Sequence, residues 1–237
     1  MLTIEGLKAG YHEITVLHGL DFHVGTGQIV AFLGANGAGK STLLNTMSGL
    51  IKPTAGRIVL ENRSIGGLPA EDIVNFGISL VPQGRRIFPG LTVRENLLVA
   101  RTKATQTSPG GFDAILKKVY ELFPRLEERS EQLGWSLSGG EQQMLSVSRA
   151  LISRPRVMLL DEPSLGLAPL IYEALFDALV EIRRREGIAL LVVEQNAEQA
   201  MRIADHVHIL ELGRIVASGS PAQIASDPAI ERAYLGG

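Results

Sequence analysis

Apolar and polar positions divide the chain into short buried strands and longer amphipathic helices. Continuous apolar runs predict strands buried on both faces at 28–33, 156–161 and 189–194. Residues 2–7 and 14–24 alternate loosely and predict antiparallel strands. Further short strands are predicted at 57–60, 78–82, 206–211 and 214–218, and helices at 40–50, 139–153 and 170–186, with short helices after the last strand. Strands that alternate with helices predict an α/β fold with a mostly parallel, wound sheet and an N-terminal antiparallel β subdomain.

Residues 84–135 differ from the segments around them. They are more charged, contain P-G and S-P-G-G breaks, and have helix-like stretches near 92–101 and 113–128. Together with the helix that follows, they predict a helical insert of about 84–154. Segments 1–83 and 155–237 then form the core of a single domain that spans 1–237.

Composition limits the classes of function. The chain has 237 residues, of which 45% are apolar, enough for one large core. Its net charge of −2 produces no strong field that would attract nucleic acid, and R-R-R-E at 183–186 is better explained as a complement to a helix dipole. The absence of cysteine excludes disulfides and thiolate zinc sites. His206 and His208 share a strand face without a third ligand, so we expect no metal cluster there.

The amino-terminal residues have no basic stretch followed by an apolar core, so no signal peptide is expected. No apolar run approaches the ~20 residues that span a bilayer. We therefore expect a cytoplasmic protein.

A glycine-rich loop carries the strongest chemical signal. Residues 34–41 read G-A-N-G-A-G-K-S, which fits G-x-x-x-x-G-K-[ST], and they lie between a predicted strand and a predicted helix. Backbone N–H groups of such a loop wrap phosphates, while Lys40 reaches the β- and γ-phosphates and Ser41 ligates Mg²⁺. An ordinary glycine-rich turn is the alternative, which the strand and helix context disfavours. The predicted ATP-binding loop comprises Gly34, Ala35, Asn36, Gly37, Ala38, Gly39, Lys40, Ser41 and Thr42.

Two further motifs complete the chemistry. V-M-L-L-D-E-P at 157–163 ends a buried strand in two acids, of which Asp161 would hold the Mg²⁺ shell and Glu162 would polarise the attacking water. A helix-capping acid is the alternative for that segment. L-S-G-G-E at 137–141 exposes backbone donors at a helix start and predicts a second anion-binding turn. The helix after it argues against a plain linker.

The order and spacing of G-A-N-G-A-G-K-S-T, V-P-Q, L-S-G-G-E and L-L-D-E-P resemble the ATP-binding cassette (ABC) family over nearly the whole chain. The resemblance implies ATP hydrolysis with Mg²⁺ by two cassettes arranged head to tail. It implies that Tyr11 stacks on adenine and that Gln83 senses Mg²⁺ and the attacking water. It also implies a role in trans, on the ATP of the partner cassette, for Ser138, Gly139, Gly140 and Glu141.

Two positions depart from the common pattern of that family. Gln195 stands where most members have a histidine that contacts the γ-phosphate, and Ala168 stands where the loop after E-P usually ends in aspartate. Glutamine can donate a hydrogen bond to phosphate but carries no proton or positive charge near neutral pH. We still expect catalysis by Glu162, Gln83 and Gln195.

The same departures indicate one subgroup of that family. S-L-G-L-A-P, V-E-Q-N-A, V-P-Q-G-R-R-I-F and the final R-A-Y-L-G-G resemble the shorter ATPase subunit of branched-chain amino-acid importers. Arg85 and Arg86 could contact a permease helix or could simply be solvated.

The resemblance implies an energy-coupling subunit on the cytoplasmic face of the inner membrane. Its partners would be itself or a paralogous ATPase, two transmembrane permeases and, indirectly, an external solute-binding protein, with no nucleic acid. The alternatives are the ATPase of a urea or amide importer, of a lipid or lipopolysaccharide exporter, or a soluble cassette that acts on ribosomes or DNA.

Overall fold

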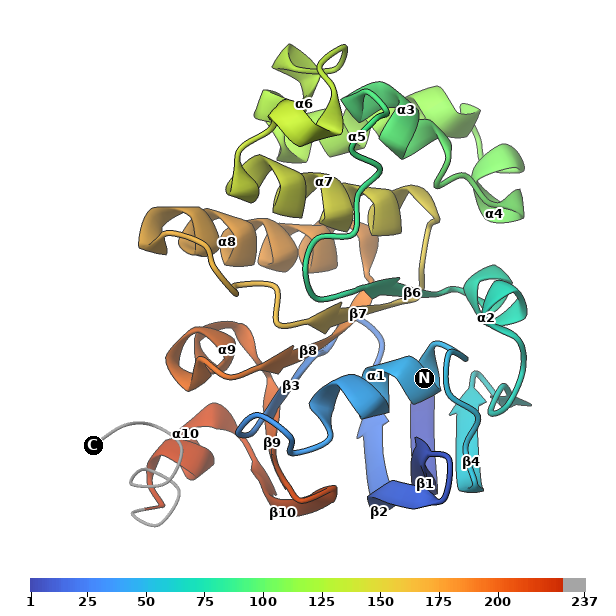
Figure 1. The fold of residues 1–237 in the computed structure, drawn as a ribbon, viewed down its shortest axis with the longest axis vertical. Coiled ribbons are helices and arrows are strands. Elements are labelled where there is room, and N and C mark those ends of the chain that lie inside the picture. The colour runs from blue at the N-terminus through green and yellow to red at the C-terminus, as the bar shows by residue number, and fades with distance from the viewer. Residues whose placement is uncertain (228–237) are drawn as a thin grey trace.

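The computed structural model describes residues 1–227, in which two β-sheets lie beneath a layer of helices (Figure 1). The strands are β1 Leu2–Tyr11, β2 Ile14–Val24, β3 Ile29–Leu33, β4 Ala55–Leu60, β5 Arg63–Ser64, β6 Ile78–Val81, β7 Val157–Asp161, β8 Ala189–Glu194, β9 His206–Glu211 and β10 Arg214–Gly219. The helices are α1 Lys40–Met47, α2 Ala70–Phe76, α3 Val93–Leu98, α4 Lys103–Gln106, α5 Gly111–Leu122, α6 Pro124–Glu128, α7 Gly139–Ile152, α8 Pro169–Glu186, α9 Ala197–Ile203 and α10 Pro221–Ala225, with a 3₁₀ turn η1 at Gly134–Ser136.

The larger sheet has the strand order β10-β9-β3-β8-β7-β6 and is parallel except where β10 runs against β9. Strands β3, β7 and β8 are buried along their whole length, as their continuous apolar sequences predict. Leu33 pairs with Glu194, and Asp161 pairs with Val193. The carboxyl ends of these three strands, where the predicted chemistry lies, therefore meet at one edge of the sheet.

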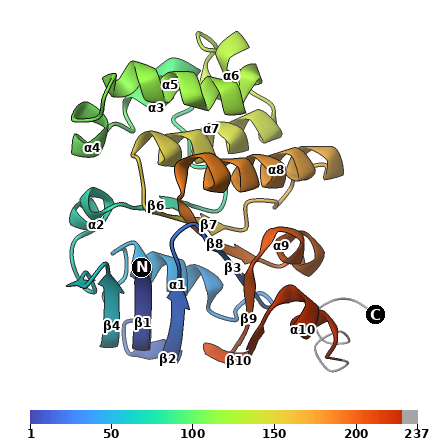
Figure 2. The ribbon, with the colours of Figure 1, turned by 180° about the vertical axis from the view of Figure 1, so that it is seen from behind.

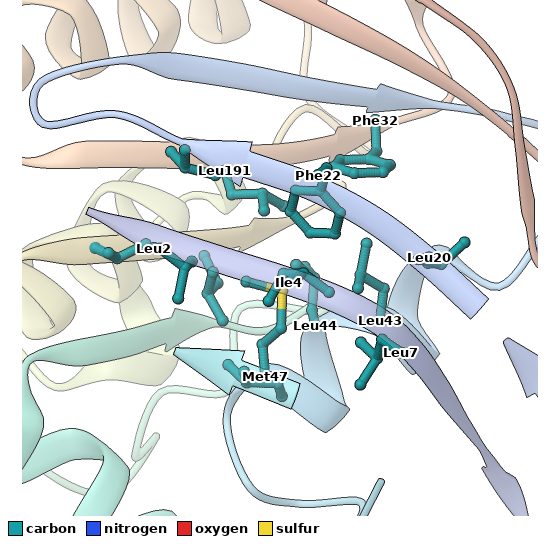
Figure 3. Close-up of a cluster of buried hydrophobic side chains, with 14 of the residues drawn as sticks. Leu2, Ile4, Leu7, Leu20, Phe22, Phe32, Leu43, Leu44, Met47 and Leu191 are labelled. Carbon is teal, nitrogen blue, oxygen red and sulfur yellow. The ribbon is translucent and has the colours of Figure 1, made fainter. Parts of the chain in front are cut away.

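The smaller sheet is antiparallel, with the order β2-β1-β4-β5, as expected for the N-terminal subdomain. Helix α1 lies against it and is almost fully buried. Figure 3 shows the core between them, in which Leu2 and Ile4 of β1 face Leu44 and Met47 of α1. This packing holds α1, and with it the loop that precedes α1, in place.

Helices α3 to α7 form a layer above the larger sheet, which α7 contacts at β6, and α8 lies between α7 and the other strands of that sheet (Figures 1 and 2). A second buried cluster joins this layer to the sheet through Val147 of α7, Phe176 of α8 and Leu160 of β7. The layer connects to the sheet through 82–92 and through 153–156. It corresponds to the helical insert expected at about 84–154.

One expected helix is interrupted. The stretch 113–128 forms two helices because Pro124 disfavours helical angles at the preceding residue, and Phe123 adopts φ −132° and ψ 72°. The helices expected at 92–101 and 40–50 end earlier, at Leu98 and Met47. Within residues 1–227, no helix is long and apolar enough to cross a bilayer. The final R-A-Y-L-G-G lies outside the described residues.

Candidate functional site

The glycine-rich loop follows β3 and ends where α1 begins, as the sequence predicts. A Cβ on Gly34 would lie 2.3 Å from the carbonyl oxygen of Leu210, so no larger residue fits beside β9. Gly39 caps α1 with φ 107°, which non-glycine residues rarely adopt. Ala35, Asn36 and Gly37 are exposed, whereas Ala38 and Thr42 are buried. The middle of the loop is therefore exposed to solvent, while its two ends are held by the sheets.

Lys40 lies beneath this loop and is only 4% exposed. Its Nζ donates hydrogen bonds to the carbonyl oxygens of Gly34 (2.8 Å) and Ala35 (3.1 Å) and lies 3.2 Å from Oε1 of Glu162. The second carboxylate oxygen of Glu162 accepts a hydrogen bond of 2.8 Å from Nε2 of Gln83. Two residues from distant parts of the chain, Lys40 and Gln83, thus hold one carboxylate in place.

Ser41 and Asp161 form a second pair at the same edge of the sheet. The Ser41 hydroxyl donates to Oδ1 of Asp161 at 3.1 Å. Burial raises the pKa of Asp161, and the Ser41 hydrogen bond and the charge of Lys40 only partly oppose that effect. A buried carboxylate with a raised pKa has an unmet demand for positive charge, which a divalent cation satisfies.

Glu162 has a strained backbone. Its φ is 45°, a left-handed angle that non-glycine residues seldom adopt, and its N–H donates to the carbonyl oxygen of Val193 at 2.9 Å. Such angles persist only where the surrounding structure enforces them, and they are concentrated at functional sites. Here the strain turns the carboxylate toward Lys40 and Gln83 instead of away from the loop.

Glu194 is a buried acid that the sequence motifs did not single out. One of its carboxylate oxygens accepts the Ser164 N–H at 2.9 Å, and the other accepts the Gln195 N–H at 3.2 Å. Burial raises the pKa of Glu194, and hydrogen bonding with Ser164 opposes the shift. One side chain therefore ties the loop after Glu162 to the turn after β8. Its position at the end of a buried strand was the available signal.

The two departures from the family pattern occupy distinct positions. Gln195 follows β8 at the same edge of the sheet, and it is exposed. Ala168 is the N-cap of α8, where its methyl group leaves the first turn without a side-chain cap. An aspartate at that position would accept hydrogen bonds from the first free N–H groups of α8.

The L-S-G-G-E segment lies at the start of α7, in the helical layer. Ser138 and Glu141 form a reciprocal capping box, and Glu141 also pairs with Arg129 at 2.8 Å. A Cβ on Gly140 would lie 2.5 Å from Cγ2 of Ile171, so this glycine also allows α7 to approach α8.

The glycine-rich loop borders a cavity of about 420 Å³. Its described lining includes Lys40, Ser41, Gln83 and Glu162, but none of the residues Ser138 to Glu141. The structure therefore brings together the predicted loop, magnesium and water-polarising residues, and it leaves the second anion-binding turn apart from them.

Val16 was not predicted and lines the same cavity. Its Cγ1 would lie 3.5 Å from a Cβ on Gly39, and its carbonyl oxygen lies against Gly213. Tyr11 is 47% exposed at the end of β1 and is not among the cavity's lining residues. An apolar residue in a loosely alternating strand gave no sequence signal.

The Arg85 side chain lies against the L-S-G-G-E turn and does not extend only into solvent. Its guanidinium would lie 2.8 Å from a Cβ on Gly139, and its Nη2 lies 3.5 Å from the carbonyl oxygen of Gly166. Arg86 accepts a 2.7 Å hydrogen bond from Arg149 through its carbonyl oxygen.

The residues fit a nucleotide with its metal. Gly37 and Gly39 line the cavity together with the buried ammonium of Lys40, so the loop leaves open space beside a positive charge. Ser41 and Asp161 offer two oxygen donors, the kind that Mg²⁺ prefers.

Comparison with known proteins agrees with this geometry. A family model described as ABC transporter matches residues 17–165, more than half of the chain. The chain belongs to the ABC transporter family. It is 46% identical, over the full length of both proteins, to the high-affinity branched-chain amino acid transport ATP-binding protein BraG of Pseudomonas aeruginosa. It is 32% identical to the lipopolysaccharide export system ATP-binding protein LptB of Haemophilus influenzae, over all of this chain and 97% of that protein.

A crystal structure of an ATP-binding cassette in its ADP conformation superposes with a TM-score of 0.85 at 26% identity. The match covers all of this chain and 99% of the other. The expected cassette fold and the expected likeness to ATPases of branched-chain amino-acid transport are thereby confirmed.

Proposed function

We propose that this cassette hydrolyses ATP and delivers the energy to an importer of branched-chain amino acids. The observation that carries the proposal is the Lys40–Glu162–Gln83 arrangement in a chain that is 46% identical to a branched-chain amino-acid transport ATPase along its whole length.

The residues of the glycine-rich loop bind the phosphates of ATP. Lys40 leaves its carbonyl partners and contacts the β- and γ-phosphates. Ser41 and Asp161 hold Mg²⁺, and Gln83 lies beside them. When bound, Mg²⁺ neutralises charge on the phosphates and orients them. Glu162, oriented from both sides, accepts a proton from the attacking water and polarises it toward the γ-phosphate.

The hydrolytic site is completed by a second cassette. None of the four residues Ser138, Gly139, Gly140 and Glu141 lines the cavity around Lys40. In a head-to-tail pair they face the ATP of the partner, which is itself or a paralogous subunit. The N–H groups at the start of α7 would then meet the γ-phosphate. Glu141 acts mainly by fixing that turn, since its carboxylate is already bound to Ser138 and Arg129.

The working complex also contains two transmembrane permeases and acts with an external solute-binding protein, so this cassette lies on the cytoplasmic face of the membrane. Import is favoured over lipopolysaccharide export because the identity to the importer ATPase is 46% and that to the exporter ATPase is 32%.

Substrate uptake tests the assignment. In cells that carry this protein, Lys40→Ala should abolish ATP-dependent uptake of radiolabelled leucine and leave urea uptake unchanged. Ala174→Ser, on the exposed face of α8, is the matched control and should leave both unchanged. Loss of urea uptake with normal leucine uptake would assign the cassette to an amide importer, and unchanged uptake of both would overturn the importer assignment.

A further inference from the structure

A cavity of about 300 Å³ opens where the C-terminal ends of α7 and α8 meet the start of α5. It shares no lining residue with the cavity around Lys40. Its walls come from both parts of the molecule. The helical layer contributes Lys118, Glu186 comes from the end of α8, and Pro155 lies in the segment that joins α7 to β7. Its volume is at the lower end of the range for small-molecule sites.

The floor of this cavity is apolar. Ile115, Leu151 and Ile188 line it and are 7%, 5% and 4% exposed, respectively. They come from three separate elements and form a compact hydrocarbon surface. Such a surface accommodates a short aliphatic group and disfavours a purely polar ion.

The rim is positively charged. Lys118 and Glu186 form an ion pair at 2.7 Å across the cavity mouth. Arg154 also lines the rim, and among the described residues its guanidinium has no ion pair or hydrogen-bond partner. The three side chains therefore leave one uncompensated positive charge over an apolar floor.

The backbone at Arg154 has an unusual conformation. Its φ is 53°, a left-handed angle that costs free energy for a residue with a Cβ. It lies between α7 and the buried Pro155, so its place is set by the elements on either side.

The geometry points to a binding site here for a small monocarboxylate with a short aliphatic body. The carboxylate pairs with Arg154, whereas Lys118 is already paired with Glu186. The aliphatic body covers Ile115, Leu151 and Ile188. A bound molecule would contact the helical layer, the end of α8 and the connecting segment at once. This inference concerns a site remote from the nucleotide and does not depend on the transported substrate.

Titration of the full chain tests the site. The protein is saturated with ADP, so that the glycine-rich loop cannot capture the probe as an anion. The δ1-methyl NMR signals of Ile115 and Ile188 then report binding of 4-methylpentanoate. The probe's primary amide has the same aliphatic body without the charge, and leucine adds an ammonium group. The variants are Arg154→Asn, chosen because asparagine tolerates left-handed angles, and Arg184→Asn, which changes an exposed arginine in the last turn of α8 that is paired with Glu181.

We expect 4-methylpentanoate to shift both methyl signals. The amide should bind the wild-type protein about tenfold more weakly, and Arg154→Asn should weaken carboxylate binding by about the same factor, since each removes one charge-assisted hydrogen bond. Arg184→Asn should bind as the wild type does. Unshifted Ile115 and Ile188 signals would overturn the site. Equal binding of amide and carboxylate by the wild-type protein, or tighter binding of leucine, would overturn the assignment to a monocarboxylate.

Discussion

Ala168→Asp should stabilise this protein by supplying the cap that α8 lacks. Ala168 has φ −67° and ψ 151°, angles that suit an N-cap, and its side chain makes no cap hydrogen bond. Pro169 at the first helical position has no N–H, so the free donors begin at Leu170. The first turn also contains no acidic residue. Because the Ile171 N–H already donates to the Ala168 carbonyl oxygen, an aspartate would meet the free N–H of Leu170 and the positive end of the helix dipole.

The magnitude follows from these two contributions. Replacing alanine by a capping residue is worth about 1 kcal/mol, and a charge at an exposed helix N-terminus adds about 0.5 kcal/mol. Because Ala168 is exposed, salt should screen the second contribution. For a chain of this size, about 1.5 kcal/mol corresponds to a rise in Tm of about 3–6 °C.

Thermal unfolding of the protein without nucleotide, at low and high salt, measures the effect. Ala168→Asn supplies the cap without the charge and should give the smaller, salt-independent part. Ala174→Asp places the same side chain at an exposed interior position of α8 and should destabilise by about 0.5 kcal/mol. The reasoning would be refuted if neither capping variant raised Tm, or if aspartate stabilised equally at Ala174.

Three further perturbations have distinct expected results. Gly34→Ala should abolish nucleotide binding in fluorescence titrations or prevent folding, because its Cβ would lie 2.3 Å from the Leu210 carbonyl oxygen; normal affinity would contradict the need for this close approach of the loop to β9. Glu194→Gln should slow ATP hydrolysis more than it weakens ATP binding, because the amide has one acceptor oxygen and cannot accept the N–H groups of both Ser164 and Gln195; an unchanged turnover rate would exclude this positioning role. His208→Phe should reduce the loss of stability on acidification. Burial lowers the pKa of His208 from 6.5 to about 4, so the unfolded chain takes up the proton at a higher pH than the folded protein does. The free energy of unfolding should therefore fall by up to about 3 kcal/mol as the pH drops from 6.5 to about 4. Chemical denaturation between those pH values measures the slope, and an equal slope in the variant would contradict the assignment.

Much of the fold could be predicted because its elements are locally encoded. The apolar run before Gly34 is buried on both sides in the structure, and the two acids at the end of β7, Asp161 and Glu162, lie where the strand pattern places them. The order of strands could not be predicted, since β3 pairs with β8 and β9, which lie far along the chain. The break at Pro124 was readable from proline chemistry and was missed because the amphipathic pattern continues across it.

The candidate site was predictable to the extent that motifs carry it. Lys40, Ser41 and Asp161 lie together as their spacing implies. The role of Glu194 depends on two backbone N–H groups, which no side-chain pattern reveals. Val16 reaches the cavity through a pairing between sheets, which is again a tertiary effect.

The central claim is that the cavity around Lys40 is half of an ATP site that a second cassette completes. The most direct test is the mass of Glu162→Gln in solution, measured by light scattering with saturating Mg²⁺–ATP and with Mg²⁺–ADP. Glutamine keeps a side chain beside Gln83 but cannot take a proton from water, so ATP should persist. The account predicts that the mass of Glu162→Gln doubles with ATP and stays that of a monomer with ADP. The double variant Glu162→Gln, Lys40→Ala should not double its mass with either nucleotide. A protein that binds ATP and remains a monomer would contradict it.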